Sequence, residues 1–282
     1  MPVIDVHGVG LYYELHGPAD APVIVLNNGI LMNAASSWLP QRGALSDACR
    51  LLLYDCRGQG LSAHPPGPYS MEQHADDLAG LLVALEIPAA HIAGISYGGE
   101  VAQAFALRHP PATRSLFLAD TVSEAGPELR LVIEGWREAA RLGDPELFYL
   151  VTVPWNFSPG FIASHAELLD AARARYRDLD FPAVVRLCEA FLSSVDFTSR
   201  LPAVTVPARI VVGELDLLKG PAYADVLHRS IAGSDLHVIP GAGHATCWEQ
   251  PAEFNRLLLE FVRGVETRSL RPTTVGGGQK TE

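Results

Sequence analysis

The sequence predicts an α/β fold in which helices cover both faces of a mostly parallel, eight-stranded sheet and a helical insertion interrupts the alternation. Short continuous apolar runs alternate with segments of helical periodicity, which is typical of parallel strands buried on both faces. One long interval contains no strand-like run. A length of 282 residues fits one such domain with an insertion.

The predicted strands are short and regularly spaced. They lie at residues 3–6, 11–15, 23–26, 51–54, 92–95, 116–119, 209–212 and 236–239. The first two flank a His-Gly-Val-Gly turn and read as an antiparallel hairpin. The remaining strands are separated by segments with helical spacing of apolar residues, chiefly 70–85, 98–109 and 251–265. Strand and helix therefore alternate, which favours a parallel, helix-covered sheet.

The insertion is predicted to form a separate cap. Helical patterns fill it at 128–142, 144–153, 163–179 and 182–195. We therefore expect an α/β core at 1–121 and 202–265 and a helical cap at 122–201. The segment 266–282 includes three consecutive glycines and has no apolar period, so it is predicted to be a disordered tail.

Composition narrows the classes of partner. The chain is 48% hydrophobic and carries a formal charge of −11, which repels phosphate backbones and anionic lipids, so neither nucleic acid nor a membrane is expected as a partner. The four cysteines show neither a C-x-x-C pair nor zinc-ligand spacing, and no motif for a metal or an organic cofactor occurs. The N-terminus lacks an export signal, so a cytoplasmic location is expected.

A serine occupies the junction between a predicted strand and a predicted helix. Residues 94–98 read Gly-Ile-Ser-Tyr-Gly, at the end of the strand 92–95 and the start of the helix 98–109. In a nucleophile elbow, glycines at these two positions admit a tight turn that pushes the serine hydroxyl out above the sheet. The pattern and its context predict Ser96 as a nucleophile.

A serine nucleophile needs a base to accept its proton and a carboxylate to orient that base. His244 lies in a glycine-rich turn directly after the last predicted strand, and Asp216 follows the strand before it. These two residues are predicted as base and acid. Asp120, which follows the strand 116–119, is the reserve acid, and Glu214 is a weaker alternative because it lies nearer its strand.

Negative charge that develops on a substrate oxygen needs two convergent backbone N–H donors. Tyr97 follows the serine at a helix N-terminus and is predicted to supply one of them. The other is expected from the loop 27–32, which follows the strand 23–26 and reads Asn-Asn-Gly-Ile-Leu-Met. Ile30 is the candidate donor in this loop.

The cap contains three large side chains in a segment rich in helix breakers. Trp155, Phe157 and Phe161 surround an Asn, a Ser, a Pro and a Gly, so an irregular loop is expected there. Such side chains either anchor the cap or line a pocket near the serine. We take them as candidate substrate-binding residues and predict that at least one lines the pocket.

Over residues 3–265 the chain resembles the α/β-hydrolase superfamily in its order of elements, its elbow and its Ser, acid, His chain order. The segments 54–62 (Tyr-Asp-Cys-Arg-Gly-Gln-Gly-Leu-Ser) and 65–70 (Pro-Pro-Gly-Pro-Tyr-Ser) are similar to the corresponding segment of 3-oxoadipate enol-lactone hydrolases and related esterases. The Asn-Gly at 28–29 with the Ser-Trp at 37–38 resembles instead 3-hydroxyacyl transacylases of rhamnolipid-precursor synthesis.

Three functions are compatible with these residues. The first is a serine hydrolase that cleaves a carboxylic ester or lactone through an acyl-enzyme intermediate. The second is an acyltransferase or thioesterase that acts on 3-hydroxyacyl-type thioesters. The third is a non-catalytic ligand receptor, which would not need an intact triad. All three imply a small-molecule ligand, and the sequence does not indicate an oligomeric state.

Overall fold

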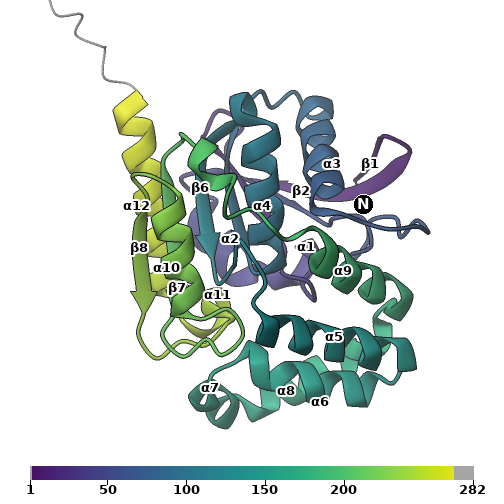
Figure 1. Cartoon of the computed structure of the whole chain (residues 1–282). Coiled ribbons are helices and arrows are strands. Elements are labelled where there is room, and N and C mark those ends of the chain that lie inside the picture. Colours follow the sequence, from purple (N-terminus) through teal and green to yellow (C-terminus); the bar gives the residue numbers. More distant parts are fainter. Residues whose placement is uncertain (1, 270–282) are drawn as a thin grey trace, which may run out of the picture.

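The computed structural model describes residues 2–269, which form one sheet with helices on both faces and a group of helices at one end (Figure 1). The strands are β1 (Val3–Val6), β2 (Val9–His16), β3 (Val23–Asn27), β4 (Arg50–Tyr54), β5 (Ala90–Ile95), β6 (Thr113–Ala119), β7 (Ala208–Gly213) and β8 (Asp235–Ile239). Their order in the sheet is β1-β2-β4-β3-β5-β6-β7-β8. Pairing is antiparallel at β1–β2 and β2–β4 and parallel elsewhere, so the predicted eight-stranded, mostly parallel sheet is confirmed.

Alternate residues of the central strands enter two separate cores. Val25 and Leu52 pack with the helices α3 (Met71–Ala84), α4 (Tyr97–Arg108) and α10 (Pro221–Ser230). Ile24 and Leu53 point to the opposite face and pack with the helices α2 (Leu39–Leu45) and α12 (Pro251–Ser269). Continuous apolar runs are required because both faces of each strand are covered. Two short helices, α1 (Ala34–Ser37) and α11 (Thr246–Glu249), complete this part.

The helices between β6 and β7 lie together beyond the carboxyl ends of the strands, in the direction in which β8 points in Figure 1. They are α5 (Pro127–Leu142), α6 (Pro145–Asn156), α7 (Pro159–Ser164), α8 (Ala166–Arg173) and α9 (Phe181–Ser194). An isolated β-bridge between Glu124 and Asp196 joins the segment that leads from β6 into α5 to the segment that leads from α9 back to β7. We propose the interval 122–201, which contains these helices, as a cap domain.

Several predicted boundaries differ from those of the structure. The first hairpin turn comprises only His7 and Gly8, because both adopt left-handed backbone angles (φ 54° and 81°) that close a two-residue turn. The predicted helix 163–179 is divided among the end of α7, α8 and a 3-10 helix at Ala174–Asp178.

The segment 155–161 is more helical than predicted. Helix α6 continues to Asn156 despite Pro154, and α7 begins at Pro159, where the Ser158 hydroxyl accepts the Phe161 N–H at 3.2 Å. Ser158 and Pro159 therefore begin a helix, at its N-cap and N1 positions, and do not break one.

The first four residues of the predicted tail are also helical. Helix α12 runs to Ser269, and the Glu266 carboxylate accepts a hydrogen bond from Arg114 at 2.9 Å, which holds this turn against the sheet. The rest of the predicted tail, 270–282, lies outside the described residues. No helix within residues 2–269 is both long and apolar enough to cross a membrane.

Candidate active site

The elbow places the Ser96 hydroxyl at the carboxyl end of the sheet, between β5 and α4. Ser96 has a φ of 54°, which is strained for a residue with a side chain and persists because the surrounding turn enforces it. A Cβ on Gly94 would overlap the carbonyl of Gly98, and one on Gly98 would overlap the carbonyl of Asn27. Both glycines are therefore required by close backbone approach.

His244 bridges the predicted nucleophile and the predicted acid. Its Nε2 lies 2.9 Å from the Ser96 Oγ, and its Nδ1 lies 2.8 Å from the Asp216 Oδ2. The other oxygen, Asp216 Oδ1, accepts the backbone N–H groups of Leu218 (2.8 Å) and Lys219 (2.9 Å). The structure thus brings His244 together with Ser96, 148 positions away in sequence, and with Asp216, 28 positions away.

A second buried carboxylate lies near Asp216 and has the opposite electrostatic character. Burial opposes ionisation of Asp216, but His244 and the two N–H donors hold its pKa below the ordinary value. Burial, together with the negative charge of Asp216, raises the pKa of Asp120 well above its ordinary value. Asp216 is therefore the stronger acid of the two and carries the negative charge beside the imidazole.

Asp120, the reserve candidate, does not contact His244 in the described structure. Its Oδ2 accepts the Thr246 hydroxyl at 2.5 Å and its Oδ1 accepts the Gly213 N–H at 2.9 Å. It therefore ties β7 to the start of α11. Glu214, the other alternative, accepts the Gly241 N–H at 2.8 Å and holds the turn that precedes the histidine.

The loop after β3 packs directly against the elbow. A Cβ on Gly29 would lie 3.7 Å from the Ile95 carbonyl oxygen. Within the described part of the chain, the N–H groups of Ile30 and Tyr97 have no protein acceptor. Two unpaired backbone donors on adjoining segments are what an oxyanion site needs.

The Asn-Gly and Ser-Trp pairs of this region have a structural role. Trp38 Nε1 donates to Asn28 Oδ1 at 2.7 Å, and Asn28 Nδ2 donates to the Tyr54 carbonyl at 2.9 Å and to Asp55 Oδ1 at 3.0 Å. All four side chains are buried. Asn28 and Trp38 therefore anchor the start of the loop 27–32 to β4 and to the N-terminus of α2.

The cap touches the histidine loop through the α6–α7 connection. The Ala245 N–H donates to the Asn156 carbonyl at 3.0 Å, and the Ser158 N–H donates to the Glu249 carboxylate at 3.2 Å. Ala245 and Glu249 both follow His244 closely in sequence. The segment with the three candidate substrate-binding residues is thus fixed beside the predicted base, His244.

Those three residues differ in burial. Trp155 is half-buried against the larger core, and Phe157 stacks on the buried Phe161 with ring centroids 5.1 Å apart. The His165 ring also stacks on Phe161, with ring centroids 4.1 Å apart. The three candidate residues lie beside the histidine loop, and their role in substrate binding stays a prediction.

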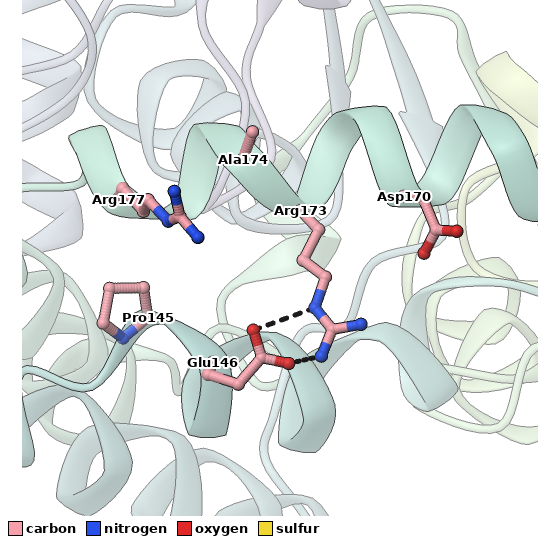
Figure 2. Close-up of a pocket in the computed structure, with 6 residues that line it drawn as sticks. All are labelled: Pro145, Glu146, Asp170, Arg173, Ala174 and Arg177. Carbon is pink, nitrogen blue, oxygen red and sulfur yellow. Dashed lines mark hydrogen bonds and ion pairs between the residues drawn. The ribbon is translucent and has the colours of Figure 1, made fainter.

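A different cavity, shown in Figure 2, is polar and lies between α6 and α8 of the cap. It has a volume of about 240 Å³ and is lined by Pro145, Glu146, Asp170, Arg173, Ala174 and Arg177. Arg173 pairs with Glu146 across it (Figure 2). No predicted site residue lines this cavity, and we assign it no part in the chemistry.

Sequence reasoning missed the contacts that brace the site. Lys219 pairs with Glu100 in the first turn of α4 and so connects the acid loop to the elbow helix. Gln59 contacts the loop with Ile30. No sequence pattern marks such pairs, because the partners are up to 119 positions apart. Among residues 2–269, no group of three His, Cys, Asp or Glu side chains is arranged to hold a metal ion.

The fold agrees with comparisons to known proteins. The model of the alpha/beta hydrolase family matches residues 6–257, so the chain belongs to that family. This is consistent with the resemblance noted from the elbow and the order of elements.

Individual relatives cover nearly the whole chain. The 3-oxoadipate enol-lactonase 2 of Acinetobacter baylyi is 30% identical over 251 residues, which are 88% of this chain and 91% of that protein. A protein of Variovorax paradoxus named "Putative carbamate hydrolase RutD" is 30% identical and covers 90% of this chain and 97% of its own length. The crystal structure of the enol-lactonase from Burkholderia xenovorans superposes with a TM-score of 0.87 at 30% identity, over 93% of this chain and all of that one (100%).

Proposed function

We propose that this protein hydrolyses a carboxylic ester or lactone through an acyl-enzyme formed on Ser96. The observation that supports this most strongly is the position of His244, within hydrogen-bond distance of both Ser96 Oγ (2.9 Å) and Asp216 Oδ2 (2.8 Å). That arrangement allows one imidazole to take the serine proton while the carboxylate holds its tautomer. Membership of a hydrolase family and a lactonase relative agree with the assignment.

In the proposed first half-reaction, His244 Nε2 accepts the hydroxyl proton as Ser96 Oγ attacks the carbonyl carbon. The oxyanion of the tetrahedral intermediate accepts hydrogen bonds from the N–H groups of Tyr97 and Ile30. The intermediate then collapses, the bond to the leaving oxygen breaks, and His244 returns the proton to that oxygen. An ester loses its alcohol at this step, whereas the ring-opened lactone stays attached by its acyl group.

In the second half-reaction, water gives a proton to His244 and attacks the acyl carbon. The same N–H groups bind the second oxyanion, and collapse releases the carboxylic acid and returns the proton to Ser96. Asp216 stabilises the imidazolium in both halves without being protonated itself. The depressed pKa of its carboxyl fits this role.

No observation favours acyl transfer over hydrolysis. The similarity to transacylases rests on the Asn-Gly at 28–29 and the Ser-Trp at 37–38, and the side chains of Asn28 and Trp38 hydrogen-bond to each other at 2.7 Å inside the protein. They thus have a structural reason to be present. We therefore propose water as the acceptor.

A panel of substrates tests this proposal. We expect the wild-type protein to release p-nitrophenol from esters of graded acyl length and to open a lactone, and we expect Ser96→Ala to do neither. Acyl-thioester cleavage, and ester formation with an added alcohol, are measured alongside. Transfer to the alcohol that exceeds hydrolysis would contradict water as the acceptor, and ester hydrolysis that survives in Ser96→Ala would contradict the nucleophile.

A further inference from the structure

Gln59 is buried beneath the loop that carries Ile30. Its Nε2 donates to the carbonyl of Gly29 at 3.0 Å and to the carbonyl of Ile30 at 3.3 Å. The residue is only 3% exposed. Since both partners are acceptors, the amide can face them only with its NH₂ group, so the orientation of this side chain is determined.

The carbonyl of Gly29 and the N–H of Ile30 belong to the same peptide group. That group is planar and trans, so its C=O and N–H point in opposite directions. A donor that fixes the direction of the carbonyl therefore fixes the direction of the N–H. Through this geometry, Gln59 controls where the Ile30 N–H points without touching the substrate.

Gln59 contributes something that the loop does not supply by itself. The Met32 N–H also donates to the Gly29 carbonyl, at 3.0 Å, but this bond closes a turn within the loop. Gln59 comes from the segment after β4, and its bond joins residues 30 positions apart. The bond from Gln59 therefore fixes the loop 27–32 relative to the sheet.

The Gln59 backbone is itself held in a tight turn. Its N–H donates to the Cys56 carbonyl at 2.9 Å, and its carbonyl accepts the Ser62 N–H at 3.1 Å. The Leu61 N–H donates to Asp55 Oδ2 at 2.9 Å. The donor to the oxyanion loop therefore sits on a rigid support.

We propose that Gln59 is a positioning residue that orients the Ile30 N–H toward the oxyanion. This inference rests on the proposed function, because it requires Ile30 to be one of the two oxyanion donors. It predicts that changes at Gln59 weaken binding of the transition state and leave binding of the substrate nearly intact.

The first test replaces the donor by an apolar side chain of similar size. Removal of an oxyanion donor itself lowers kcat by about 100- to 1000-fold, so loss of its support in Gln59→Leu should lower kcat by about 10- to 100-fold, with KM nearly unchanged. A trifluoromethyl ketone forms an oxyanion when it adds to the serine. Its Ki should rise in the variant by about the same factor as kcat falls.

The second test uses the isosteric variant Gln59→Glu. An ionised carboxylate repels the two carbonyls, whereas a protonated one donates a hydrogen bond to them. The ratio of the variant's kcat to that of wild type, measured at each pH, should therefore rise as the pH falls. A purely structural role would not produce this pH dependence. This variant also tests the inference if Gln59→Leu does not fold.

Asn255 provides a matched control. Its Nδ2 donates to the Pro40 carbonyl at 3.0 Å, and like Gln59 it is buried and has a side-chain oxygen without a partner among the described residues. It lies on α12, away from the elbow. Asn255→Leu should lose stability but keep the wild-type kcat and the wild-type Ki for the ketone.

The possible results separate this inference from the proposed function. If the ketone fails to inhibit the wild-type protein, the proposed function is contradicted and this inference falls with it. If the ketone inhibits wild type and Gln59→Leu with the same Ki, or if the Gln59→Glu ratio does not change with pH, only the role of Gln59 is overturned.

Discussion

Removal of the Lys219 amine should destabilise the protein more than any surface change. Its Nζ lies 2.9 Å from both carboxylate oxygens of Glu100, and the two side chains are 3% and 0% exposed. Glu100 also accepts the Thr121 hydroxyl at 2.5 Å and the Val122 N–H at 3.1 Å. Lys219→Met leaves this carboxylate buried without its counter-charge.

The magnitude follows from the burial of the pair. Breaking a buried ion pair by removing one partner costs about 3–5 kcal/mol, because the remaining charge stays desolvated. With an unfolding entropy of roughly 2 cal/mol/K per residue, a chain of this length loses about 2 °C of melting temperature per kcal/mol. We expect Lys219→Met to melt about 6–10 °C below wild type.

Calorimetry or circular dichroism of four proteins tests this reasoning. The double variant Lys219→Met/Glu100→Gln removes both charges and should be more stable than the single variant. Arg256→Met breaks an exposed pair with Glu253 at 2.7 Å and should melt like wild type. The reasoning is refuted if Lys219→Met melts like wild type, or if the double variant is less stable than the single one.

Three further predictions concern the acid, the cap and a buried histidine. Asp216→Asn should lower kcat by about 10⁴-fold and leave the circular dichroism spectrum unchanged, because the imidazole then adopts the wrong tautomer; a larger loss in Asp120→Asn would show that the acid is misplaced. Trp155→Ala and Phe161→Ala should change the ratio of kcat/KM between short and medium acyl chains, at about 0.8 kcal/mol per buried methylene, and an unchanged profile in both would exclude pocket lining. Burial lowers the pKa of His74 to about 3. As the pH falls below about 6.5, the unfolded chain therefore binds a proton at this histidine before the folded protein does. The free energy of unfolding of the wild-type protein should then decrease by up to about 1.4 kcal/mol per pH unit. In His74→Gln this slope should be shallower, and equal slopes for the two proteins in urea titrations would argue against a buried neutral imidazole.

The central elements could be predicted because their signals are local. Each buried strand is a contiguous apolar run, and the elbow compresses a strand end, a helix start and two obligatory glycines into five residues, 94–98. The positions of Asp216 and His244 follow from topology, since the carboxyl ends of neighbouring parallel strands meet at one edge of the sheet. The structure places His244 beside Ser96 and Asp216 beside His244.

The features that were missed depend on tertiary contacts. The turn near Ser158 contains helix breakers, yet the same residues cap α7 once the Ser158 N–H binds Glu249 of a distant helix. Glu266 is helical because Arg114 holds it from another element. The supports of the site at Gln59 and Lys219 likewise exist only after folding. A single sequence contains no pattern for such pairs.

The most direct test of the account is the site of reaction with a fluorophosphonate. Such a probe phosphonylates an activated serine hydroxyl, so the wild-type protein should gain the mass of one adduct, and peptide mapping should place it on Ser96. His244→Ala should react far more slowly, and Ser96→Ala should not react at all. An adduct on another residue, or labelling that persists in Ser96→Ala, would contradict the assignment of Ser96 as the nucleophile.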